Sequence, residues 1–244
     1  VFLCTGYVSA VWQCGNCYVL LFKAKQIMGY DYHANKAFVG KLSLIENHLY
    51  VTLFGEDWLL DTGAPTSFGE TDFIVINDQS FDLESDYLGL NAEQLSSLTK
   101  HKIFGLIGMD ILSQFEMVMD VANEKIVLSK KEISMNGNVL EMHNFMGIPI
   151  VKASIDGADK NLFFDTGAQI SYWHDQGLNG YQSIGVMEDF YPGFGEFKTN
   201  VYLVNMTLGN KKFSIRCGIL PSMLQMSLSM GGTEGILGNE LLKD

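Results

Sequence analysis

Two aspartates in nearly the same local sequence are the residues of this chain best suited to chemistry. Asp61 stands within Leu59–Ala64 and Asp165 within Phe163–Ala168, and each follows two large apolar residues and precedes Thr-Gly-Ala. A carboxylate at the end of a buried strand is costly unless it is hydrogen-bonded or retained for a reaction. Two carboxylates brought together can share one proton, so that one serves as a base and the other as an acid. We therefore expect the two aspartates to act as a pair.

Predicted strands and turns lead into each aspartate. Alternating and continuous apolar runs broken by Gly, Asp and Glu are typical of β-hairpins. The apolar pair before each aspartate indicates the end of a buried strand, and the glycine after it indicates a tight turn. The predicted hairpins are Leu49–Phe54 with Trp58–Leu60 around a turn at Gly55–Asp57, and Ile150–Ile155 with Leu162–Phe164 around a turn at Asp156–Asp159.

The similarity between the two copies extends beyond the aspartates. Two further segments recur in the same order, and such a repeat indicates two homologous units. Each unit carries an aliphatic-aliphatic-glycine motif downstream of its aspartate. The matching segments are Ile76–Leu83 with Leu208–Ile215, and Gly105–Leu112 with Gly235–Leu242.

The copies differ between these landmarks. The second copy is longer and contains Phe190–Phe197, in which Pro192 and Gly193 suit a type II turn between strand-like flanks. This pattern predicts a long hairpin in the second unit alone. The first unit instead has Asn91–Gln94, a capping-box-like start for a short helix through Leu98.

Asp-Thr-Gly-Ala after two apolar residues, with a downstream aliphatic-aliphatic-glycine motif, resembles the aspartic peptidases. The resemblance runs from about Ala37 to the end of the sequence and is nearer to retropepsins than to pepsins in its Gly-Ala form and short units. Both units nevertheless lie on a single chain, as in pepsins. It implies an all-β fold of two homologous β-barrel lobes related by a pseudo-twofold axis, with short helices. It also implies an aspartic endopeptidase that acts on a peptide or protein substrate.

The resemblance also implies a role for each matching residue. Asp61 and Asp165 would form the catalytic dyad, and the hairpin tip would lie over the cleft as a flap. Ser67 and Ser171 lack a nucleophile-elbow context, so we expect them to form hydrogen bonds in the loops near the dyad. The remaining implied positions are Thr62, Gly63, Ala64, Thr166, Gly167 and Ala168 supporting the dyad; Leu106, Ile107, Gly108, Ile236, Leu237 and Gly238 as a buttress behind the loops; and Tyr191, Gly193 and Phe194 in the flap.

Ala64 and Ala168 lead to an expectation about pH. Many pepsins carry a hydroxyl residue at this place, which can donate a hydrogen bond to a carboxylate and favour its charged form. Alanine removes that donor. We therefore expect a raised upper pKa for the dyad and activity that reaches mildly acidic or neutral pH.

The repeat predicts how the chain is divided. We expect an N-terminal hydrophobic extension at 1–36, a first lobe at 37–135 and a second lobe with the flap hairpin at 136–244. The first lobe ends in a hairpin of Phe115–Val121 with Ile126–Leu128. The matching closing strands are missing after Leu242, so the sequence is expected to be a fragment. A homodimer that exchanges lobes would be one way to supply the missing strands.

The segment Val1–Phe22 carries no charge and is long enough to span a bilayer, although polar residues lie at its centre. Three interpretations stay open: a membrane anchor, the end of a targeting segment, or residues upstream of a start at Met28. Lys23 and Lys25 after an anchor would favour a cytoplasmic body. The compartment stays open, and the alternatives are a cytoplasmic or a membrane-anchored chain.

Composition excludes several other classes of function. The net charge of −12 argues against nucleic acid as a partner. Cys14 and Cys17 have C-x-x-C spacing without a second ligand pair, Cys217 is expected to be a buried thiol, and the histidines show no metal-ligand spacing. We expect no metal and no cofactor. The alternative to an enzyme is a catalytically inactive peptide-binding or regulatory module on the same fold.

Overall fold

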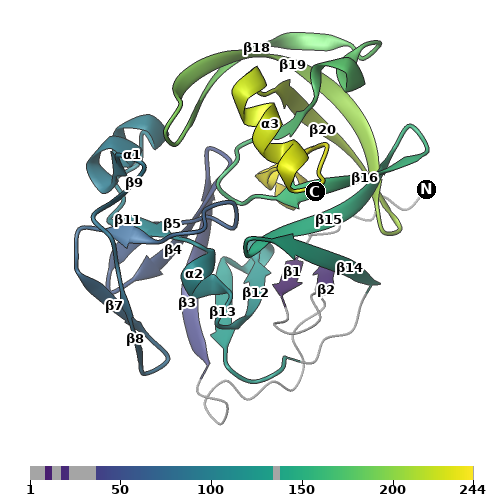
Figure 1. Cartoon of the computed structure of the whole chain (residues 1–244). Coiled ribbons are helices and arrows are strands. Elements are labelled where there is room, and N and C mark those ends of the chain that lie inside the picture. Colours follow the sequence, from purple (N-terminus) through teal and green to yellow (C-terminus); the bar gives the residue numbers. More distant parts are fainter. Residues whose placement is uncertain (1–8, 13–17, 22–36, 134–137, 244) are drawn as a thin grey trace.

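The structure is a computed structural model that describes residues 9–12, 18–21, 37–133 and 138–243. Within these residues β-strands predominate and the helices are short, as the sequence predicts for an all-β protein. Two large sheets hold most of the strands (Figure 1). We call residues 37–133 the first half and residues 138–243 the second half.

The first large sheet belongs mainly to the first half. Its strands are β1 (Ser9–Trp12), β3 (Phe38–Ile45), β4 (His48–Leu53), β5 (Glu56–Leu60), β6 (Phe68–Gly69), β11 (Gly105–Ile107), β12 (Glu116–Asp120) and β13 (Lys125–Ser129). They lie in the order β1-β12-β13-β3-β4-β5-β11-β6. Strand β5 pairs antiparallel with β4 and parallel with β11, so it is central. Its Trp58, Leu59 and Leu60 are accordingly all buried.

The second large sheet belongs mainly to the second half. Its strands are β2 (Tyr18–Leu21), β14 (Asn138–Phe145), β15 (Ile148–Ile155), β16 (Ala158–Phe164), β17 (Ser171–Trp173), β18 (Ser183–Tyr191), β19 (Gly195–Leu208), β20 (Lys211–Ile219) and β21 (Gly235–Leu237). They lie in the order β18-β19-β20-β17-β21-β16-β15-β14-β2. Strand β19 also pairs with β15, which closes a circuit of six strands in the order β19-β20-β17-β21-β16-β15.

Short elements complete the fold. Two small sheets are formed by β7 (Phe73–Ile76) with β8 (Gln79–Asp82) and by β9 (Asp86–Tyr87) with β10 (Leu90–Asn91). The helices are α1 (Ala92–Thr99), α2 (Met109–Leu112) and α3 (Ser222–Met230), with 3-10 turns η1 (Val121–Asn123), η2 (Asp175–Leu178) and η3 (Asn239–Lys243).

Most predicted hairpins are present, with small shifts at the turns. The β4–β5 turn is Phe54-Gly55, both at positive φ, so Glu56 and Asp57 already belong to β5 rather than to the turn. A two-residue turn with positive φ at both positions matches the twist of the flanking strands. The β15–β16 turn is likewise two residues, Asp156-Gly157. The predicted capping box at Asn91 is present at the start of α1.

The two halves differ in whether their strands close into a circuit. The strands that would close the first half are β7 and β8, which have four residues each and form a separate sheet. Their counterparts β19 and β20 have 14 and 9 residues and reach several neighbours. In the described residues the first large sheet therefore stays open, and a parallel bridge between Phe68 and Glu84 links it to the chain after β8.

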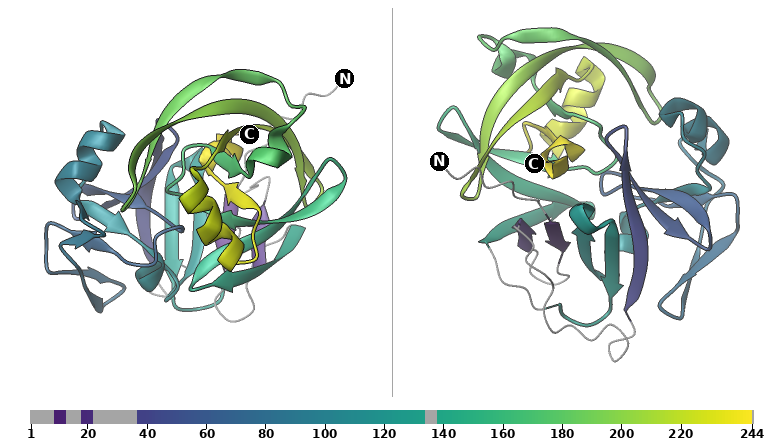
Figure 2. Two further views of the ribbon diagram at one scale, coloured as in Figure 1. Left: turned by 45° about the horizontal axis from the view of Figure 1, so that its top comes forward. Right: turned by 180° about the vertical axis from the view of Figure 1, so that it is seen from behind.

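The two halves share one core. The largest cluster of buried apolar side chains contains Leu60 and Phe115 from the first half and Phe164 and Leu237 from the second. Figure 2 shows β18 and β19 arching over the space between the halves, with the tip beside α1. One cluster of buried apolar side chains thus spans both halves, and two smaller clusters lie beside it.

The described parts of the N-terminal segment are strands. Strand β1 pairs with β12 and β2 pairs with β14, so each extends one of the large sheets (Figure 1). These residues therefore join both halves, although the sequence predicts an extension separate from them. No helix among the described residues is both long and apolar enough to span a bilayer. Cys217 is a buried free thiol as predicted, whereas Cys14 and Cys17 lie outside the described residues.

Candidate active site

The backbone presents the two aspartates in equivalent ways. Asp61 follows β5, and its N–H donates to the carbonyl of Ile107 at 3.0 Å. Asp165 follows β16, and its N–H donates to the carbonyl of Leu237, also at 3.0 Å. In both cases the supporting carbonyl belongs to a parallel neighbouring strand, β11 or β21. Each aspartate is thus held where its strand leaves a buried sheet.

The threonines after the aspartates connect the two loops. The N–H of Thr62 donates to Oγ1 of Thr166 at 3.0 Å, and the N–H of Thr166 donates to Oγ1 of Thr62 at 3.0 Å. Each hydroxyl in turn donates across the interface, from Thr62 to the Phe164 carbonyl and from Thr166 to the Leu60 carbonyl, both at 2.7 Å. Both threonines are fully buried. Four reciprocal hydrogen bonds therefore fix the spacing of the loops.

Glycine is required at the next position in each loop. A Cβ on Gly63 would lie 2.3 Å from Cγ of Asp165, and a Cβ on Gly167 would lie 2.4 Å from Oδ2 of Asp61. Each carboxyl group therefore rests on the glycine of the opposite loop. The arrangement brings the Asp61 and Asp165 carboxyl groups within mutual hydrogen-bonding reach.

The environment favours a shared proton. Burial and repulsion from Asp165 raise the pKa of Asp61 well above its usual range, against hydrogen bonds from the N–H groups of Gly63 and Ala64. Burial also raises the pKa of Asp165, against the N–H of Gly167 and the hydrogen bond with Asp61. Two adjacent carboxyl groups cannot both ionise cheaply, so the pair retains one proton over a range of pH.

The residues behind each loop make matching contacts. The Met109 N–H donates to the Ala64 carbonyl at 2.8 Å, and the Asn239 N–H donates to the Ala168 carbonyl at 3.0 Å. Gly108 and Gly238 leave room for this approach, because a Cβ on either would lie 2.7 Å or less from a carbonyl oxygen of the loop. The segments at Ile107–Gly108 and Leu237–Gly238 therefore lie directly behind the loops.

The serines that follow each loop bind the same segments. The N–H of Gly108 donates to Oγ of Ser67 at 2.8 Å, and the N–H of Gly238 donates to Oγ of Ser171 at 3.1 Å. Ser67 also donates to Asp110 at 2.6 Å. Ser67 lies in a loop, as predicted, whereas Ser171 is the first residue of β17 and forms its hydrogen bond from that strand.

A cavity of about 310 Å³ lies over the two carboxyl groups. The first half contributes Tyr87, Leu88 and Leu95 to its wall, and the second half contributes Tyr172 and Asp189 among others. An adjoining apolar cavity of about 250 Å³ also reaches Asp165 and is lined by residues such as Pro65, Ile148 and Leu224. The two cavities share several wall residues, Asp165 and Tyr191 among them.

The predicted flap residues lie at different distances from this cavity. Tyr191 lines both cavities. Gly193 has a φ of +73°, and the Phe194 N–H donates to the Tyr191 carbonyl at 3.0 Å, which fits the predicted type II turn. Phe194 does not line the cavity over the aspartates; it packs edge-on against Phe197 of the same hairpin and remains 40% exposed.

Several cavity residues have no signal in the sequence. Tyr87, Tyr172 and Asp189 belong to short or irregular strands that carry no motif, and the tertiary fold alone brings them over the pair. Tyr172 donates a short hydrogen bond from its hydroxyl to the Asp189 carboxylate. The repeat could have indicated Tyr172 by its fixed distance after Asp165, but it could not have indicated the acidic partner.

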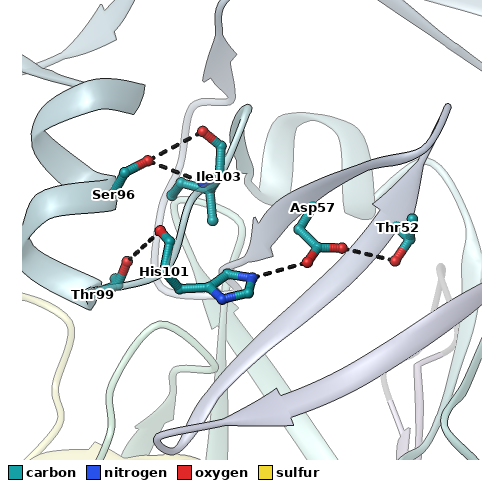
Figure 3. A network of polar contacts seen from close by, with 6 residues as sticks. All are labelled: Thr52, Asp57, Ser96, Thr99, His101 and Ile103. Atoms are coloured by element: carbon teal, nitrogen blue, oxygen red, sulfur yellow. Dashed lines mark hydrogen bonds and ion pairs between the residues drawn. The ribbon is translucent and has the colours of Figure 1, made fainter.

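A polar network holds α1 against the first sheet (Figure 3). Nε2 of His101 lies 2.9 Å from Asp57, which also accepts a hydrogen bond from Thr52 at 2.9 Å. Ser96 bonds both the N–H and the carbonyl of Ile103. Because α1 carries Leu95 in the cavity wall, this network supports the first half's side of the cavity.

A second polar contact lies beneath the Asp165 loop. His48, only 1% exposed, has its Nε2 2.7 Å from the side-chain amide of Gln169. Asn239 donates to the carbonyls of Asn47 and Thr166. Burial lowers the pKa of His48 from 6.5 to about 4, against a smaller effect of the Gly167 backbone. The β3–β4 turn of the first half therefore supports the aspartate loop of the second.

No group of three or more His, Cys, Asp or Glu among the described residues could hold a metal ion.

Comparison with known proteins gives little further information. No family model matches the chain, and no curated protein matches it in sequence. Among solved structures, the chain is similar to the Prototype Foamy Virus protease-reverse transcriptase, with a TM-score of 0.29 and 17% sequence identity over 39% of this chain. The match covers 11% of that viral chain. A TM-score this low supports neither a fold nor a function.

Proposed function

We propose that this protein is an aspartic endopeptidase whose two halves are the lobes of a retropepsin-like fold. The observation that carries the proposal is the pairing of Asp61 and Asp165 over reciprocal Thr62 and Thr166 hydrogen bonds beneath a cavity. A duplicated loop that buries two mutually interacting carboxyl groups is energetically costly for a purely structural purpose. The 37–135 and 136–244 boundaries of the proposed lobes remain predictions.

The proposed reaction needs only water and the pair. The ionised carboxylate of the dyad takes a proton from a water molecule, which attacks the carbonyl carbon of the scissile peptide bond. The protonated carboxyl group donates to the carbonyl oxygen as charge develops there, and the departing amine then receives a proton. The shared proton belongs to the pair and not to one residue.

The substrate would be an extended peptide. Two adjoining cavities meet at Asp165, so that the side chains before and after a scissile bond held there would each find a pocket. The β18–β19 hairpin would cover the bound segment, with Tyr191 facing the cleft.

Raised pKa values of the pair imply a particular pH dependence. The reaction requires one proton on the pair, and activity is lost when that proton dissociates at high pH. Because burial and mutual repulsion raise the upper pKa of the pair, this loss is shifted upward and activity extends toward neutral pH. Burial and like charge support this upward shift, in addition to the missing hydroxyl at Ala64 and Ala168.

The test is digestion of a denatured protein and a peptide library across pH, with and without a statine-type inhibitor. We expect Asp61→Asn and Asp165→Asn each to lower kcat/KM by about a thousandfold or more. Asp72→Asn, in an exposed turn of the first half, serves as the matched control and keeps full activity. Cleavage that persists in both variants would refute the proposal that Asp61 and Asp165 catalyse peptide hydrolysis. Peptide binding without cleavage by the unaltered chain would instead favour an inactive peptide-binding module.

A further inference from the structure

The cavity over the pair contains a third carboxylate, Asp189. It lies on β18 two residues before Tyr191, so both side chains point to the same face of the strand. Met187 and Tyr191 on that face pack against an apolar cluster of the second half. An acidic side chain in this row is therefore unexpected for packing alone.

The contacts of Asp189 leave it able to accept more hydrogen bonds. One oxygen accepts from the hydroxyl of Tyr172, and the other accepts from the N–H of Phe190 at 2.8 Å. A carboxylate has about four lone-pair sites, so acceptor capacity remains on both oxygens. If the only purpose were to satisfy Tyr172, two apolar side chains of the same shape would serve equally well.

Among the described residues that line the cavity, no cationic side chain offsets a charge on Asp189. Asp61, Asp165 and Asp189 all line the cavity, and none of the described residues lining it is Lys, Arg or His. Repulsion from Asp189 contributes to raising the pKa of Asp165, so the two carboxyl groups influence each other across the cavity. A positively charged group in the cavity would relieve this repulsion.

Resting on the proposed function, we infer that Asp189 is a specificity-determining residue that binds a lysine or arginine side chain of the substrate next to the scissile bond. The apolar part of such a side chain would lie against the leucine and tyrosine side chains of the cavity wall, and its cationic end would reach Asp189. The adjoining cavity has no carboxylate except Asp165, and it suits a large apolar side chain on the other side of the bond.

The test uses octapeptides that differ at one position flanking the scissile bond, with Lys, Arg, norleucine or Glu there. Norleucine has nearly the size of Lys without the charge. At one flanking position we expect kcat/KM for Lys to exceed that for norleucine by about tenfold or more, and Glu to be the poorest residue. In Asp189→Asn the Lys-to-norleucine ratio should fall to about one, while cleavage of the norleucine peptide persists.

Two variants separate recognition from a structural role. Glu188→Gln removes the neighbouring acid on the outer side, where it pairs with Lys198, and should leave the Lys preference unchanged. Tyr172→Phe removes the hydroxyl but keeps the carboxylate, so the Lys preference should persist. A preference lost equally in Tyr172→Phe and Asp189→Asn would assign Asp189 to positioning Tyr172 and overturn the inference.

The inference and the proposed function fail in different ways. Binding of the same peptides to Asp61→Asn, measured by calorimetry, reports the Lys preference without any cleavage. If Lys peptides bind selectively but the unaltered chain cleaves none of them, the proposed peptidase function is refuted and the recognition site at Asp189 stands. Efficient cleavage with equal rates for Lys and norleucine at every position would keep the peptidase and remove the role of Asp189.

Discussion

The two halves carry the same aspartate loop on the same frame of strands but differ in what lies beneath it. His48 directly follows the β3–β4 turn and meets Gln169 of the opposite loop. At the equivalent position after the β14–β15 turn stands Ile148, and the residue matching Gln169 is Pro65. Ile148 and Pro65 line the apolar cavity beside Asp165. The frame is therefore duplicated, while one side is joined by polar contacts and the other is hollow and apolar.

This difference indicates that the two regions beneath the aspartate loops have different roles. The parts in contact with the carboxyl groups are symmetric, because both aspartates need the same backbone support. The residues behind these loops do not contact the carboxyl groups and can differ between the halves. The contact of His48 with Gln169 can therefore hold the halves together, while the cavity at Ile148 and Pro65 can accept a ligand. Substitutions of equivalent residues in the two halves test which parts of the molecule behave alike in both halves and which do not.

The largest effect is expected at the glycines. Gly63→Ala and Gly167→Ala would each drive a Cβ into the carboxyl group of the opposite loop. Because a displacement of about 1 Å can cost a hundredfold in rate, both variants should lose peptide cleavage by about that factor or more. Activity assays are paired with thermal unfolding to separate loss of activity from loss of fold. Full activity in either variant would contradict the symmetry of the loops.

The threonines should show equal effects on stability. Thr62→Val and Thr166→Val each remove a buried hydroxyl and leave an N–H and a carbonyl without a partner. We expect each to lower the free energy of unfolding by about 2–4 kcal/mol, measured by urea denaturation. Thr71→Val, whose hydroxyl bond is exposed, is the control and should change little. A cost in only one half would show that the loops depend on each other unequally.

His48 should make the stability depend on pH. Its pKa is about 4 in the folded chain and 6.5 when exposed, so the unfolded chain takes up a proton first as pH falls. Its contribution to stability is therefore intact above pH 6.5 and falls by about 3 kcal/mol toward pH 4.

The measurable quantity is the slope of the free energy of unfolding against pH between about pH 4 and pH 6.5. His48→Leu, which copies the apolar character of Ile148, should lose this slope although it is less stable at neutral pH, because Gln169 loses its partner. His143→Gln, at an exposed position of β14, is the matched control. Denaturation at several pH values measures both, and an unchanged slope in His48→Leu would refute the assignment.

The smallest effect is expected at the two helices before the buttress strands. Asn91 caps α1 through a complete capping box, whereas α3 begins after Pro221 without a side-chain cap. Asn91→Ala should therefore lower stability by about 1 kcal/mol. Ser222→Ala, in the first turn of α3, should stay within about 0.5 kcal/mol in the same assay. Equal losses would mean that capping does not distinguish the halves.

The sequence predicted the elements whose signals are local. The hairpins before Asp61 and Asp165, the capping box at Asn91 and the turn at Gly193 follow from turn residues and apolar alternation, and all are present. The mutual approach of the aspartates could be predicted because the repeat itself implies a symmetric partner.

Long-range features lay beyond such reasoning. Whether a sheet closes depends on strand length at its edges, and β7 and β8 are too short to do so in the described residues. The uncharged N-terminal segment gave no sign that β1 and β2 would extend both sheets, because a continuous apolar run is compatible with several structures. Asp189 and His48 acquire their partners only after the halves have come together.

One further consequence concerns β19. This strand runs without interruption for 14 residues, from the tip beside Leu88 to its pairing with β15 in the body of the second half. Its partner β18 has an irregular register between Ser183 and Gly185, where Gly185 has a φ of +141°. The β18–β19 hairpin is therefore fixed in the second half at one end and lies beside Leu88 of the first half at its tip. Its irregular strand pairing lies near the fixed end. We therefore expect a ligand to reach the cavity by bending of this hairpin near Gly185, while its strands stay paired.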